Sequence, residues 1–111
     1  MPTESVASTA LVATLMDAAF NRPRDPRSAE YQAGVRAGLA LRICGTPAVH
    51  QHTPGSAQHD AFYSGIDEAR AIWRDHQEKE ARARYNRARQ EKYDAADAAG
   101  ATADNTQPDG A

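Results

Sequence analysis

Three histidines and the single cysteine are the residues of this sequence whose side chains are best suited to hold a metal ion. They are Cys44, His50, His52 and His59. Thiolate and imidazole are preferred zinc ligands, but here no Cys-x-x-Cys or His-x-x-x-His pair sets two of them at a ligating spacing. We therefore interpret this segment as a polar loop and predict no metal and no cofactor. A metal or small-molecule site here is the least favoured of three functional hypotheses.

Side chains that could form a catalytic group are adjacent in the chain rather than spaced for catalysis. Ser56, His59 and Asp60 lie within one helical turn, where the geometry of a catalytic triad is not available. Ser56 is better placed as a helix cap. Asp67 and Glu68 are consecutive, so on a helix they point to different faces and cannot act as a paired acid and base. The sequence thus predicts a protein without catalytic residues, and not an enzyme.

The basic residues of the C-terminal half offer a different chemistry, the binding of phosphate groups. The net charge is only −2, yet residues 70–93 hold eight basic and four acidic side chains, whereas residues 94–111 hold four acidic and none basic. A basic helix interleaved with Tyr85 and Tyr93 could follow a phosphate backbone and stack on bases. The alternative is an ordinary solvated helix, with the acidic tail folded over it. The predicted nucleic-acid-binding residues are Arg74, Lys79, Arg82, Arg84, Arg87, Arg89 and Lys92.

Helical periodicity predicts the elements that position these residues. The first helix runs from about Ser5 to Asn21 and carries two apolar rows: Leu11, Leu15 and Ala19, and Val12, Met16 and Phe20. Pro23 ends it, and residues 22–27 form an arginine-rich linker that we interpret as a solvated connection. Ser28 caps a second helix that reaches Ile43. After a loop over residues 44–55, Ser56 caps the third helix.

Glycines at helical spacing indicate where two of these helices approach each other. Gly34 and Gly38 lie four apart in the second helix, and each destabilises a helix by roughly 1 kcal/mol relative to alanine. Close approach of another helix would offset this, so we expect Gly65 of the third helix to pack against them. The predicted structural core is Tyr31, Gly34, Gly38, Phe62, Gly65, Ile66 and Trp73.

The fold predicted from these elements is all-α. A small helical hairpin core is joined by an additional N-terminal helix and a long charged C-terminal helix. Residues 1–27 form the N-terminal amphipathic helix and linker, residues 28–73 the two-helix core, residues 74–98 a charged helical extension, and residues 99–111 a disordered acidic tail. Glu78 with Arg82, and Glu80 with Arg84, are expected to pair along the extension. Whether the first helix packs on the core or on a second copy stays open.

Composition limits the compartment and suggests partners. No stretch approaches the roughly 18 apolar residues of a membrane span, and no signal peptide is recognised. A single cysteine fits a reducing compartment, so we expect a cytoplasmic protein with no membrane partner. The apolar core is small, and a homodimer or a bound partner would bury more apolar surface.

One short pattern, Tyr/Phe-x-x-Gly-Val/Ile, occurs at residues 31–35 and again at residues 62–66. With Cys44, Pro47 and the Pro54-Gly55-Ser56 turn, it is similar to the ribosome modulation factor family, including short phage and plasmid proteins grouped with it. The resemblance covers about residues 29–73. It implies two helices joined by a proline-containing loop, in a small cytosolic protein that binds ribosomes or RNA under slow growth and silences them.

The sequence therefore leaves two alternative functions open. The first is a non-enzymatic regulatory protein that modulates ribosomes or RNA through the basic helix. Because ribosome-binding members of the family are strongly basic whereas this chain carries −2, the second is a phage- or mobile-element-borne accessory protein that binds and inhibits a host protein.

Overall fold

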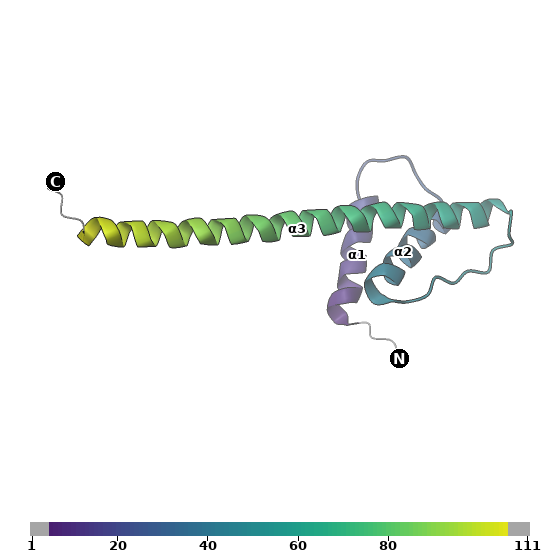
Figure 1. The fold of residues 1–111 in the computed structure, drawn as a ribbon. Coiled ribbons are helices and arrows are strands. Elements are labelled where there is room, and N and C mark those ends of the chain that lie inside the picture. Colours follow the sequence, from purple (N-terminus) through teal and green to yellow (C-terminus); the bar gives the residue numbers. More distant parts are fainter. Residues whose placement is uncertain (1–4, 107–111) are drawn as a thin grey trace. The chain divides into compact units, whose positions relative to one another are not determined.

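The chain folds into α-helices joined by loops, as expected from the sequence. The computed structural model describes residues 5–106, and in this range the helices are α1 (Val6–Phe20), α2 (Ala29–Cys44) and α3 (Ala57–Thr106), with no strand among them (Figure 1). The chain divides into two compact units, one up to His76 and the other from Gln77 onward. The first unit contains α1, α2 and the beginning of α3, and the second contains the rest of α3.

A serine caps each helix, and for α2 and α3 it is the serine that the sequence predicts. The Oγ atoms of Ser5, Ser28 and Ser56 accept a hydrogen bond from the backbone N–H three residues later, at 3.0, 3.1 and 3.1 Å. These bonds satisfy N–H groups that have no partner inside the helix. α2 ends at Cys44, and the left-handed backbone of the following Gly45 (φ 74°) turns the chain so that the N–H of Thr46 bonds to the carbonyl of Ala40 at 3.2 Å.

The core of the first unit is built from all three helices. α1 packs against α2 and buries Val12, Met16 and Ala19. This answers the question left open by the sequence, because α1 contributes to the same core as α2 and α3. The core cluster comprises Val12, Met16, Tyr31, Val35, Leu39 and Ala69, and the partly buried Ile72 and Trp73 pack against it.

Glycines bring α2 and α3 into backbone contact, as the spacing predicts. A Cβ added to Gly34 would overlap the carbonyl oxygen of Phe62, and one added to Gly65 would overlap the carbonyl oxygen of Tyr31. A Cβ on Gly38 would lie 2.6 Å from the Cβ of Ala69. Any side chain at these three positions would force the two helices apart.

The C-terminal end of α3 differs from the expectation. α3 continues through Gly100 to Thr106, so the predicted disordered tail is wrong for residues 99–106; residues 107–111 lie outside the described residues. A single glycine in a helix costs about 1 kcal/mol but does not end it. Alanines surround Gly100, and the first proline beyond it is Pro108. The local sequence therefore favours continued helix across this position.

Candidate nucleic-acid interface

The basic residues of α3 are displayed to solvent. All seven predicted nucleic-acid-binding residues lie on this helix, and all seven are exposed. Six belong to the second unit, and Arg74 belongs to the first. The six are therefore carried by one continuous helix, which fixes their positions relative to one another.

The helical period separates the six into different faces. At 3.6 residues per turn, Arg82, Arg89 and Lys92 fall within an arc of about 80°, while Arg84 and Arg87 lie on the opposite side of the helix. Tyr85 and Tyr93 fall on the same side as the first three. We name the surface formed by Arg82, Tyr85, Arg89, Lys92 and Tyr93 the basic-aromatic face. The seven-residue set predicted from the sequence thus does not form a single surface.

Contacts within the basic-aromatic face leave its rings accessible. Tyr85 is 66% exposed and Tyr93 is 52% exposed. The guanidinium carbon of Arg89 lies 5.4 Å from the centroid of the Tyr93 ring, within the range of a cation–π contact. Together with Ala88 and Lys92, these side chains line a shallow surface hollow. The face therefore combines positive charge with aromatic surface.

Acidic side chains do not neutralise this face. Between Arg82 and Tyr93 the one acidic residue is Glu91, which lies on the other side of the helix. The expected pairs of Glu78 with Arg82 and Glu80 with Arg84 do not form, and within the described residues none of these four side chains is in an ion pair. Exposed pairs of this kind contribute little and restrict two long side chains. The guanidinium of Arg82 is thus available to an external anion.

The arginines of the linker are held by the fold instead. Arg24 forms two hydrogen bonds of 3.0 Å to the Glu68 carboxylate, and its Nη1 also donates to the carbonyl of Ala19 at 2.9 Å. The guanidinium of Arg27 lies 3.9 Å from the centroid of the Tyr31 ring. The interpretation of this linker as a solvated connection is therefore wrong for Arg24, whereas the rest of residues 22–27 is exposed. Sequence reasoning missed the role of Arg24 because its carboxylate partner is 44 positions away.

The hydrogen bonds between Arg24 and Glu68 perturb both groups. They hold the pKa of the Glu68 carboxyl below its usual value, an effect opposed by burial and supported by the Tyr31 hydroxyl, which also donates to Glu68. In turn, the hydrogen bond with Glu68 raises the pKa of Arg24. This pair joins the linker to α3 and is structural.

The histidines of the loop form a cluster of packed rings. The ring of His50 lies 5.4 Å from that of His52, 5.3 Å from that of His59 and 4.9 Å from that of Phe62, measured between centroids. Nδ1 of His50 accepts the backbone N–H of His52 at 3.1 Å, so its Nε2–H donates to the Tyr63 hydroxyl at 3.2 Å. Across the described residues, no three His, Cys, Asp or Glu side chains are placed to bind a metal ion. These rings pack the loop onto α3.

Comparison with protein-family models, curated proteins and solved structures gives no match to this chain. Within residues 5–106, no helix has both the length and the apolar character needed to cross a membrane.

Proposed function

We propose that this protein is a non-enzymatic regulatory protein that binds RNA through the basic-aromatic face of α3. The observation that carries the proposal is the grouping of three cations and two exposed tyrosines on one side of a helix, where no acidic side chain lies between Arg82 and Tyr93. Phosphates attract the cations, and bases stack on exposed aromatic rings. We expect a protein with this function to act in the cytoplasm.

The spacing of the face favours single-stranded RNA. Tyr85 and Tyr93 are eight residues apart, which is about 12 Å along the helix at 1.5 Å per residue, with Arg89 between them. Unstacked bases of a loop or single strand can reach such rings, whereas bases inside a duplex cannot. The resemblance to the ribosome modulation factor family supports ribosomal RNA as the physiological target.

The experiment compares two faces of the same helix. The protein is freed of bound nucleic acid by nuclease treatment and purified away from the nuclease. It is then titrated into a fluorescent single-stranded RNA, and binding is followed by anisotropy at several salt concentrations. The test variant carries Arg82→Gln and Arg89→Gln. The matched control carries Arg84→Gln and Arg87→Gln, which removes the same charge from the opposite side of α3.

The two variants distinguish RNA binding at the basic-aromatic face from attraction of RNA to the total positive charge of the helix. We expect the test variant to lose more affinity than the control, and its salt slope to fall by about 1.4 for two lost phosphate contacts on a single strand. Equal losses in both variants would contradict the assignment of this face. Absence of RNA binding, together with a nuclease-resistant complex with one host protein in lysate, would favour the inhibitory accessory protein instead.

A further inference from the structure

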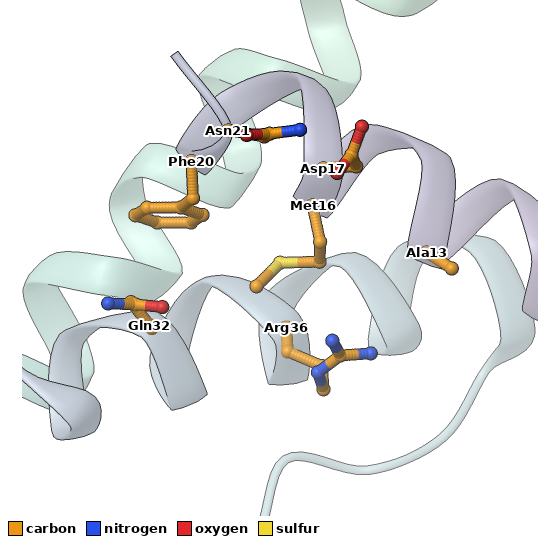
Figure 2. Close-up of a pocket in the computed structure, with 7 residues that line it drawn as sticks. All are labelled: Ala13, Met16, Asp17, Phe20, Asn21, Gln32 and Arg36. Atoms are coloured by element: carbon orange, nitrogen blue, oxygen red, sulfur yellow. The ribbon is translucent and has the colours of Figure 1, made fainter. Parts of the chain in front are cut away.

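A groove runs between α1 and α2 in the first unit, and the functional proposal does not use it. Met16 and Phe20 lie between the two helices, while the other lining residues stand along the rims (Figure 2). The rim on α1 carries Asp17 and Asn21, and the rim on α2 carries Gln32 and Arg36. On each rim the charged residue and the amide are four positions apart, one helical turn.

The charges on the two rims are opposite and unused. Asp17 and Arg36 are both exposed, and in the part of the chain that the structure describes neither forms an ion pair. They stand on opposite rims near the same level of the groove, and Asn21 and Gln32 stand on opposite rims nearer Phe20 (Figure 2). The groove thus presents one acidic and one basic edge around an apolar floor.

This arrangement is complementary to itself. A twofold axis parallel to the groove would lay α1 of one copy over α2 of the other. Asp17 of each copy would then face Arg36 of the other, and Asn21 would face Gln32. A twofold axis across the groove would instead lay α1 over α1, and the opposite charges would not meet. In a twofold interface every contact occurs twice, so both ion pairs form together.

We propose that this groove is the interface of a homodimer, in which two α1–α2 hairpins pack face to face as a four-helix arrangement. The partly buried Phe20 of each copy, beside the buried Met16, would lie at the shared centre. The small core of the first unit gives a reason for such packing, because a dimer buries apolar surface that the single chain cannot. The interface uses no residue of the basic-aromatic face.

The test uses charge reversal in the full chain, treated with nuclease so that RNA cannot bridge copies. Asp17→Lys makes both rims basic, and Arg36→Glu makes both rims acidic. Sedimentation velocity is measured for the wild-type protein, for each variant and for an equimolar mixture of the variants. Both positions are exposed, so the helical content measured by circular dichroism should stay close to that of the wild-type protein.

We expect the wild-type protein to sediment as a dimer and each variant alone to dimerise at least about tenfold more weakly, since like charges would face each other. The mixture should regain the dimer, because each acidic groove can face a basic one. A wild-type protein that is monomeric at high micromolar concentration would overturn the proposal. So would variants that dimerise as well as the wild-type protein, or a mixture that regains nothing.

Discussion

The carboxylate of Glu68 accepts one hydrogen bond from each terminal nitrogen of the Arg24 guanidinium, Nη1 and Nη2, and both nitrogen–oxygen distances are 3.0 Å. The same carboxylate accepts the hydroxyl of Tyr31, so one side chain of α3 ties together the linker and α2. Both charged side chains are about one-fifth exposed, which limits solvent screening of the pair. These hydrogen bonds hold the linker that follows α1 against α2 and α3.

Replacing Glu68 by glutamine should destabilise the protein by about 1.5–3 kcal/mol, the range for hydrogen bonds to charged groups. The neutral amide accepts the guanidinium poorly and leaves Arg24 without its counter-charge. Urea unfolding followed by circular dichroism measures the change. Asp67→Asn is the matched control: its contact with Arg70 is 3.9 Å long and exposed, so a loss below about 1 kcal/mol is expected. Equal losses would contradict the role assigned to the pair.

The stability contributed by Glu68 should depend on pH in a defined direction. Its pKa is lower in the folded state than in the unfolded state, so on acidification the unfolded state binds the proton first. The contribution is therefore complete above the unfolded pKa of about 4.3 and is lost as the pH falls through the folded value. The difference in unfolding free energy between the wild-type protein and Glu68→Gln should shrink below about pH 4. If the difference in unfolding free energy instead grew on acidification, the pKa of Glu68 would be higher in the folded state than in the unfolded state, which contradicts the prediction.

Gly34→Ala should destabilise the first unit by more than the 1–3 kcal/mol typical of overpacking, since the added methyl group meets backbone rather than a movable side chain. Thermal unfolding of this variant is compared with that of Gly100→Ala. Gly100 is also helical but has nothing within 4 Å of an added Cβ. There, alanine is expected to be neutral or to stabilise the helix by up to about 1 kcal/mol. Similar melting curves for the two variants would show that α2 and α3 are not in backbone contact.

Stacking on the basic-aromatic face can be separated from charge attraction. Tyr85→Leu combined with Tyr93→Leu keeps every cation of the face, so the salt slope of RNA binding should stay unchanged. The affinity should fall by about 1–3 kcal/mol for each stacked base that is lost. Anisotropy titrations over a range of salt concentrations give both quantities. A changed slope with an unchanged affinity would point to a charged surface without stacking.

Local sequence determined much of the architecture. The serine caps, the glycine that ends α2 and the apolar rows all act within about one turn, so their signals are readable from neighbouring residues. The contact of Gly34 and Gly38 with α3 could also be predicted, because two glycines in one helix need a compensating neighbour. The partition of the basic residues into faces follows from helical period alone. The predicted set of seven nevertheless joins Arg84 and Arg87 to Arg82, although they point away from it.

The tertiary structure decided which residues far apart in the sequence are in contact. Arg24 and Glu68 are 44 positions apart, and nothing in the linker distinguishes an arginine that meets a carboxylate from one that meets water. The packing of α1 on α2 of its own chain likewise depends on which apolar stripe lies closest once the chain is folded. The groove with Asp17 and Arg36 on opposite rims exists because of that packing. Such pairings depend on three-dimensional proximity, whereas caps and periodicity depend on chain neighbours.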